Sequence, residues 1–272
     1  MRGGKKTLFT FLIFGYAFLY LPIISLVIYS FNESRRVTTW TRFSTKWYEA
    51  LLQNQQVLES AWVSLKIAAI SASFAVILGT MAALVIVRFP KSRGSTLFSG
   101  MVTAPLVMPD VITGLALLFL FIVLEQSIGW PLGRGALTIS IAHITLAMAY
   151  VTILVRSRLA DFDRSLEEVA LDLGARPLKV FFVITLPIIA PSLISGWLLG
   201  FTLSLDDVVI ASFLSGPGAT TLPMIIFSSV RLGMSPEINA LATIIITLVT
   251  LAILIAGVLL SRHHRLHKRT KR

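Results

Sequence analysis

The stretch from Glu168 to Gly174 reads Glu-Val-Ala-Leu-Asp-Leu-Gly, and the stretch from Ile184 to Pro187 reads Ile-Thr-Leu-Pro. This block is polar and helix-forming, yet it lies between hydrophobic segments that are long enough to cross a bilayer. Polar backbone and charged groups without partners are costly in lipid. We therefore expect the block to fold as an ordered loop on the membrane surface, between two transmembrane segments.

Local sequence signals also predict an ordered loop here. Ser165 followed three residues later by Glu168 predicts a capping box at a helix N-terminus. Gly174 suits a left-handed cap at the end of that helix, and Pro177 suits the first turn of the next one. One face of the first helix is apolar and consists of Leu166, Val169, Ala170 and Leu173. An amphipathic helix lying on lipid is the alternative, although this face is short and has no aromatic anchor.

The composition of the chain is that of a membrane protein. Of its 272 residues, 56% are hydrophobic and only 14% are charged, and the mean hydropathy is +0.84. The apolar residues form runs near the length needed to span hydrocarbon. Residues 1–272 are therefore predicted to form a single all-α integral membrane domain with six transmembrane helices. Their bounds are roughly Leu8–Tyr29, Ala61–Val87, Leu97–Leu124, Leu137–Val155, Ala190–Phe213 and Ala240–Leu260.

Basic residues lie mostly on one side of these six spans. The N-terminus, Arg88–Arg93, Arg156–Leu186 and the tail after Ser261 share that side and hold 17 of the 24 Lys and Arg residues. Because cytoplasmic loops carry the excess of Lys and Arg, both termini and the Glu168 loop are predicted to be cytoplasmic. The basic tail follows a span directly, so we assign it to anionic lipid and not to nucleic acid. The opposite side holds six basic residues: Arg35, Arg36, Arg42, Lys46, Arg134 and Arg231.

The sequence carries no pattern for catalysis. It has no Gly-x-x-x-x-Gly-Lys-Ser/Thr phosphate-binding loop, no Gly-x-Ser-x-Gly and no His-Glu-x-x-His. It has no cysteine, which excludes disulfides and thiolate metal sites. We therefore expect no catalytic residue, metal site or cofactor in this chain. His143, inside the fourth span, is expected to bond to a neighbouring helix and not to bind a metal or relay protons.

Two of the predicted spans contain carboxylates. The third places Pro105, Pro109 and Asp110 in an apolar run, so its helix should be kinked or broken where protein or water satisfies the freed backbone. The fifth carries Asp206 and Asp207, which are expensive in an apolar helix unless they face water, a partner or a cation. At about 1.5 Å per residue from the cytoplasmic ends of straight helices, the three acids lie at one depth. A structural kink, an ion pair with another subunit and a position near the headgroups are the alternatives.

The spacing of the loop resembles the cytoplasmic EAA loop of ABC importer permeases, in which Glu-Ala-Ala is followed by three residues, Gly, nine residues and Ile-x-Leu-Pro. This chain departs from that pattern only at Val169. Further segments resemble the permeases of polyamine ABC importers, and among them those for putrescine most. These segments are Leu21–Ile23, Tyr29–Asn32, Lys46–Tyr48, Met108–Gly114, Ser204–Ile210, Ser215–Gly218 and Ser235–Ala240.

This resemblance implies half of a heterodimeric permease in the bacterial inner membrane. Its partners would be a homologous second permease, a periplasmic polyamine-binding protein and an ATPase dimer that holds ATP and magnesium. The third and fifth spans would line the interface with the second permease. Residues 165–187 would form the coupling loop, and the residues implied in ATPase coupling are Glu168, Ala170, Gly174, Ile184, Leu186 and Pro187.

Putrescine is the expected substrate, and Asp110, Asp206 and Asp207 are expected to line its path. A path for a protonated polyamine needs spaced carboxylates between apolar or aromatic surfaces. Spermidine or a cationic amino acid is the alternative within the importer class. An ion channel or a structural membrane subunit is the alternative from another class.

Overall fold

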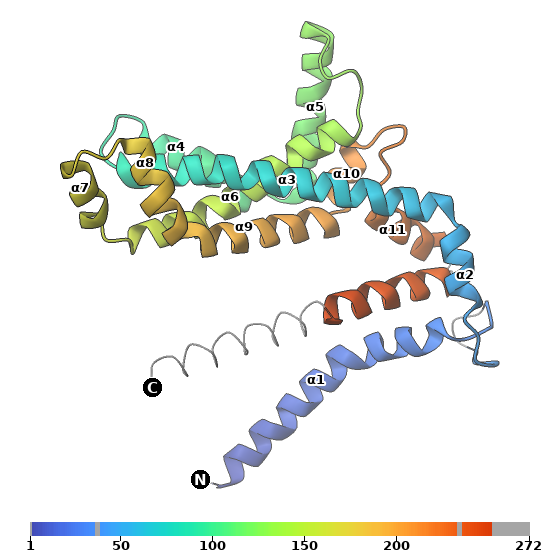
Figure 1. The fold of residues 1–272 in the computed structure, drawn as a ribbon. Helices are drawn as coiled ribbons and strands as arrows, with labels where there is room; N and C mark the ends of the chain where they lie inside the picture. Colours follow the sequence, from blue (N-terminus) through green and yellow to red (C-terminus); the bar gives the residue numbers. More distant parts are fainter. Residues whose placement is uncertain (1, 36–38, 233–235, 252–272) are drawn as a thin grey trace. The chain divides into compact units, whose positions relative to one another are not determined.

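The computed structural model describes residues 2–35, 39–232 and 236–251. Regular secondary structure in these ranges is helical, apart from an isolated bridge between Asn32 and Phe43. The chain divides into two compact units, Glu59–Phe227 and a smaller one made of Met1–Leu58 with Ser228–Arg272 (Figure 1). The prediction of an all-helical membrane protein is confirmed, because the described helices include several that are long and apolar enough to cross a bilayer.

Five helices in the described part of the chain meet that criterion. They are Leu8–Ser30 within α1 (Arg2–Ser30), α3 (Gln55–Arg88), α5 (Asp110–Ile128), α6 (Ala136–Ala160) and the continuous segment Pro177–Asp206. The sixth predicted span, Ala240–Leu260, overlaps a shorter apolar helix over Pro236–Leu251, and its last residues lie outside the described ranges. Six crossings therefore stay a prediction.

The third predicted span, Leu97–Leu124, is broken and not one helix. It consists of α4 (Ser95–Thr103), the 3-10 turn η1 (Ala104–Leu106) and then α5. Pro109 stands directly before α5 with an extended backbone, φ −59° and ψ 137°. Because proline has no N–H to donate and restricts the residue before it, the helix cannot run on through this point.

The fifth predicted span, Ala190–Phe213, is also two helices, which corrects the expectation of one. Helix α9 (Leu186–Asp206) ends at Asp206, and α10 (Val209–Leu214) follows after a bend. Asp207 has an extended backbone at this bend, with φ −69° and ψ 126°. No proline or glycine stands at the bend, and the two carboxylates Asp206 and Asp207 are its only local mark in the sequence.

Small residues allow α3, α6 and α9 to pack closely in the larger unit. Gly196 and Gly200 lie about one turn apart on α9, and an added Cβ at either would come within 3.3 Å of Val151 or Ala147 on α6. Gly79 on α3 is tighter still, because a Cβ there would lie 2.8 Å from Val151 Cγ1. In a membrane, helices associate largely through such close van der Waals packing. These three helices therefore form the core of the unit (Figure 1).

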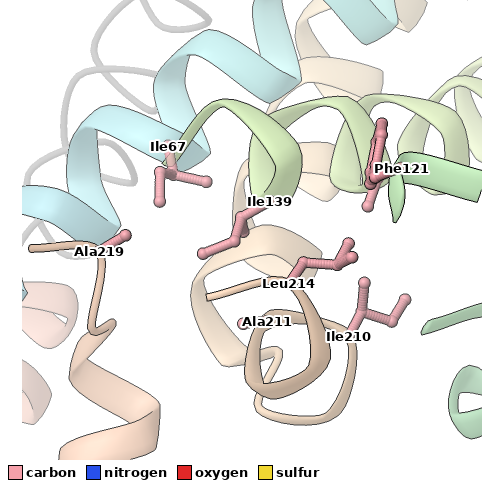
Figure 2. Packing of buried hydrophobic residues seen from close by; sticks show 8 residues of the cluster. Ile67, Phe121, Ile139, Ile210, Ala211, Leu214 and Ala219 are labelled. Atoms are coloured by element: carbon pink, nitrogen blue, oxygen red, sulfur yellow. The ribbon is translucent and has the colours of Figure 1, made fainter. Parts of the chain in front are cut away.

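A second hydrophobic cluster fixes α10 in place. Ile210, Ala211 and Leu214 of α10 are fully buried. They cluster with Ile139 of α6 and Phe121 of α5, as Figure 2 shows. Although α10 has only six residues, this packing gives the bend before it one defined geometry.

In the smaller unit, the buried side chain of Asn32 organises the segment between α1 and α2 (Lys46–Gln53). Its amide nitrogen donates to the Thr39 carbonyl at 2.7 Å, and its amide oxygen accepts from the Thr41 N–H at 3.0 Å. The Asn32 carbonyl accepts from the indole N–H of Trp47 at 2.8 Å.

Gly79→Ala is expected to destabilise the larger unit by about 1–3 kcal/mol, because the new methyl group would overlap Val151 and crowd the Met148 carbonyl oxygen. Thermal unfolding of the detergent-purified protein measures the change. Gly100→Ala on α4 is the matched control, since a Cβ there meets no heavy atom within 4 Å. A melting temperature equal to that of the control would show that the close approach of α3 and α6 is not needed.

Candidate functional site

The predicted loop starts with a short helix, α7 (Ser165–Asp172), but the capping box is wrong. Ser165 is the first helical residue and makes no side-chain cap with Glu168. Asp163 binds the start of the helix instead, because its Oδ1 accepts a hydrogen bond from the Ser165 N–H at 3.0 Å. Hydrogen bonds from Ser165 hold the pKa of Asp163 below its usual value. An Asp side chain commonly accepts from the N–H two residues further on, and this bond satisfies one of the N–H groups left free at the start of a helix.

The end of α7 follows the sequence prediction. Gly174 has φ +84°, the left-handed conformation that glycine adopts without steric cost. The Gly174 N–H donates to the Leu171 carbonyl at 2.9 Å, and the Ala175 N–H donates to the Ala170 carbonyl at 3.0 Å. This pair of bonds is a Schellman motif, which satisfies carbonyls that the helix end leaves free. Pro177 then opens α8, as predicted.

The second half of the predicted loop is helical. Helix α8 (Pro177–Val180) continues through a π-helical turn, η2 (Phe181–Thr185), into α9, so Pro177–Asp206 is one continuous helical segment. Ile184 therefore lies in the π turn, while Leu186 and Pro187 open α9. Pro187 has no N–H for a regular i→i−4 bond, and the wider turn before it accommodates this loss.

The apolar face predicted for α7 is uncovered. Leu166, Val169 and Leu173 are exposed, Leu173 by 83%. Glu168 and Gly174 are exposed as well, whereas Ala170 is half-buried. The described chain thus presents a helix with an apolar face that none of its own residues covers, at the end of the larger unit opposite α10 (Figure 1).

A hollow of about 450 Å³ lies where the two predicted spans break, and all three predicted acids line it. Asp110 is the first residue of α5, Asp206 is the last residue of α9, and Asp207 follows it. Tyr150 and Leu146 of α6 contribute to the same wall. The depth estimate assumed straight helices, which is wrong for the third span. The acids nevertheless share one hollow, because both helix breaks face it.

Asp207 is engaged by protein groups. Its Oδ2 accepts from the Ala211 N–H at 2.7 Å, and its Oδ1 accepts from the Ile210 N–H at 3.3 Å, so it caps α10. The same Oδ2 lies 3.2 Å from Nε2 of His143, whose Nδ1 lies 2.7 Å from Ser204 Oγ. The expectation that His143 bonds to another helix is confirmed, since Ser204 belongs to α9. Asp207 is therefore explained by its role in holding the bend together.

Asp206 and Asp110 are exposed, and their positions on their helices differ. Asp110 lies at the N-terminus of α5, where the helix dipole favours a negative charge. Asp206 lies at the C-terminus of α9, where the dipole and the free carbonyls disfavour one. A carboxylate at that end, next to a second carboxylate, forms a strongly electronegative wall. Of the three acids, Asp206 is therefore the one whose negative charge a cation in the hollow would stabilise most.

Tyr150 is a wall residue that the sequence analysis did not single out. It lies one turn after Leu146 on α6, and both side chains line the hollow. An aromatic ring beside carboxylates offers a cation–π surface and a platform for methylene groups. Aromatic residues are common in membrane helices, so no pattern distinguished this one; only its position beside the breaks does.

The chain belongs to the family of inner membrane components of binding-protein-dependent transport systems, whose family model matches residues 75–269. It is therefore a multi-pass permease subunit of the inner membrane and not an enzyme. Membership in this family implies an ATPase and a binding protein as partners, and ATP is bound and hydrolysed by that separate ATPase.

Within this family, the chain is related to the polyamine permeases. It is 61% identical to the putrescine transport system permease protein PotI of Escherichia coli (strain K12), over 92% of this chain and 89% of the relative. It is 42% identical to the spermidine/putrescine transport system permease protein PotC of the same strain, over 96% of this chain and 94% of the relative. The expected family is thus confirmed.

A solved structure shares the fold. It is a bacterial ABC transporter involved in the import of the acidic polysaccharide alginate, with a TM-score of 0.74 and 18% sequence identity. The match covers 94% of this chain and 95% of that chain. The permease fold is therefore retained at low sequence identity.

Asp207→Ala is expected to cost about 1–3 kcal/mol of stability, because His143 and two N–H groups of α10 lose their acceptor. Asp206→Ala, one residue away and exposed, is the matched control and should stay within about 0.5 kcal/mol of the parent. Thermal unfolding of both purified variants makes the comparison. Equal losses in the two variants would contradict the assignment of Asp207 as the cap of the bend.

Proposed function

We propose that this chain forms half of the translocation pathway for a polyamine, with putrescine as the first substrate. The hollow at the helix breaks is the observation that carries this proposal. It combines two exposed carboxylates, Asp110 and Asp206, with Tyr150 and the apolar side chain of Leu203. A protonated diamine carries an ammonium group at each end of a methylene chain, and this mixture of charged and apolar wall is complementary to it.

The relatives support putrescine within the polyamine class. The relative with 61% identity is named for putrescine, whereas the one with 42% identity is named for spermidine and putrescine. A cationic amino acid fits the hollow less well, because its α-carboxylate would need a positive group. Among the described residues, the wall of the hollow contains no Lys, Arg or His.

The residues 165–187 are proposed to be the coupling segment that docks on the ATPase. The exposed apolar face of α7 supports this role, since a face of this kind is normally covered by a partner. The Schellman turn at Gly174 gives the segment a fixed shape, which a mechanical contact requires. The residues proposed to contribute are Glu168, Ala170, Gly174, Ile184, Leu186 and Pro187.

A homologous second permease is proposed to complete the pathway. In helix α5 and in the segment Pro177–Asp206, only 17% of the most apolar stretch of 18 residues is buried. Both therefore have wide faces available for another subunit. A second set of helices packed against these faces would close the hollow. We therefore propose a heterodimer in which α5 and α9 line the interface.

Asp206→Asn is expected to lower putrescine uptake roughly tenfold, equivalent to about 1.4 kcal/mol, because it removes charge at the negative end of α9 while keeping the side-chain size. Uptake is measured in proteoliposomes that contain the ATPase, the second permease and the binding protein. Asp110→Asn should have a smaller effect. Glu59→Gln, the same charge change at an exposed residue that does not line the hollow, is the control.

Three outcomes would contradict these assignments separately. In a competition experiment with the parent protein, unlabelled arginine and unlabelled putrescine are compared as inhibitors of uptake. Stronger inhibition by arginine would overturn the polyamine assignment. Normal uptake by both Asn variants in assembled complexes would show that the carboxylates are not part of the path. Full activity of this permease with the ATPase and binding protein alone would overturn the heterodimer.

The proposed orientation places both termini and α7 in the cytoplasm. The sequence has no native cysteine, so single cysteines can be introduced without removing others. Arg176→Cys should react with a membrane-impermeant maleimide only after the membrane is opened, whereas Thr220→Cys should react in intact cells once the outer membrane is permeabilised. Both positions are exposed. Labelling of Arg176→Cys from the periplasm would reverse the topology.

A further inference from the structure

One carboxylate connects α7 to two other helices of the larger unit. Oε1 of Glu167 accepts a hydrogen bond from the guanidinium of Arg88 at 2.5 Å and another from the hydroxyl of Thr185. Arg88 is the last residue of α3, and Thr185 is a fully buried residue of the π turn η2. The side chain of Glu167 is only 14% exposed. Three helical segments therefore meet at a single oxygen atom.

A second contact fastens the same end of α7 to α3. The guanidinium of Arg164, the residue before α7, donates to the carbonyl oxygen of Val87 at 2.7 Å. Val87 lies in the last turn of α3, where carbonyls have no intrahelical partner. Because both Arg164 and Glu167 hold the last turn of α3, the start of α7 cannot move far without moving α3 or breaking a charge-assisted hydrogen bond.

The adjacent acid faces a different environment. Glu168, the acid of the Glu-Val-Ala sequence, is exposed, as is the apolar face formed by Leu166, Val169 and Leu173. Glu168 is therefore accessible to a partner of α7, while Glu167 is held against the permease itself. Of the two neighbouring glutamates, Glu168 is thus exposed to a partner, whereas Glu167 makes contacts within the permease.

The inward contact leads to the hollow. Thr185 immediately precedes α9, whose 21 residues end at Asp206. At 1.5 Å per residue, α9 spans roughly 30 Å. Gly196 and Gly200 pack closely against α6, which limits how far this part of α9 can shift relative to α6. A displacement at the π turn is thus carried along a helix whose far end lines the hollow.

We propose that Glu167 is the positioning residue that transmits movement of α7 to α3 and α9. This inference rests on the proposed role of residues 165–187 in coupling to the ATPase. When the ATPase displaces α7, the charge-assisted bond to Arg88 and the bond to Thr185 draw the ends of α3 and α9 with it. The bend at Asp207 then changes its position relative to a second permease.

Glu167→Gln tests this role because glutamine keeps the size and an acceptor oxygen for Thr185 but removes the charge that holds Arg88. The readout is the number of putrescine molecules taken up per ATP hydrolysed, in proteoliposomes of the complete complex with binding protein. We expect this ratio to fall roughly tenfold. Asp161→Asn is the matched control, an equal charge change at an exposed residue just after α6, and should keep the parent ratio.

A double-mutant cycle separates coupling from simple stabilisation. Arg88→Gln should lower the ratio as Glu167→Gln does, and the double variant should be no worse than either single variant, since both remove one interaction. Exchange of the two charges, Glu167→Arg with Arg88→Glu, should restore part of the ratio. A merely structural contact would reduce assembly and melting temperature without changing uptake per ATP in the complexes that assemble.

Three results would decide against the proposal. A parent-like ratio in assembled Glu167→Gln complexes would overturn it, as would additive losses in the double variant. If Glu167→Gln does not assemble, Thr185→Val removes only the buried hydroxyl, and a parent-like ratio in that variant overturns it equally. A parent complex without polyamine uptake would overturn the proposed function itself, which is a separate outcome from normal uptake in the variants.

Discussion

The bend between α9 and α10 depends on the carboxylate of Asp207. Inside hydrocarbon a helix cannot simply end, because the backbone groups that it leaves free have no water to bond with. The carboxylate of Asp207 accepts hydrogen bonds from two N–H groups of α10, and the side chain of His143 on α6 forms a hydrogen bond to the same carboxylate. These contacts, together with the buried α10 cluster, allow the bend to exist within an apolar run. Without the bend, Asp206 would be one more residue of a straight helix.

The break before α5 solves the same problem with different chemistry. There Pro109 ends the preceding helical stretch by removing a donor, so one fewer backbone group needs a partner. Its carbonyl oxygen accepts from the N–H groups of Ile112 and Thr113 at 2.9 and 3.0 Å, which starts α5. Two breaks of different origin thus meet at one hollow, and they bring together carboxylates that are almost 100 residues apart in the sequence.

The rest of the larger unit is built for stiffness. Glycine and alanine residues let α3, α6 and α9 lie close together, and such packing leaves little room for one helix to bend alone. The junction around Glu167 and the hollow around Asp206 lie near opposite ends of α9. A stiff helix between them is what a permease needs if force applied at its surface is to change a site within the membrane.

The sequence by itself determined the features that depend on local chemistry. The apolar runs predicted membrane helices, and Pro105 and Pro109 predicted a break in the third one. Gly174 predicted a left-handed cap, and the matching segments indicated the polyamine family. Tertiary structure decided what depends on distant partners. His143 and Asp207 meet across 64 residues, Glu167 and Arg88 across 79, and no local pattern encodes those contacts. The sequence therefore contained the acids, and the packing of the helices decided which one holds the bend and which one faces the hollow.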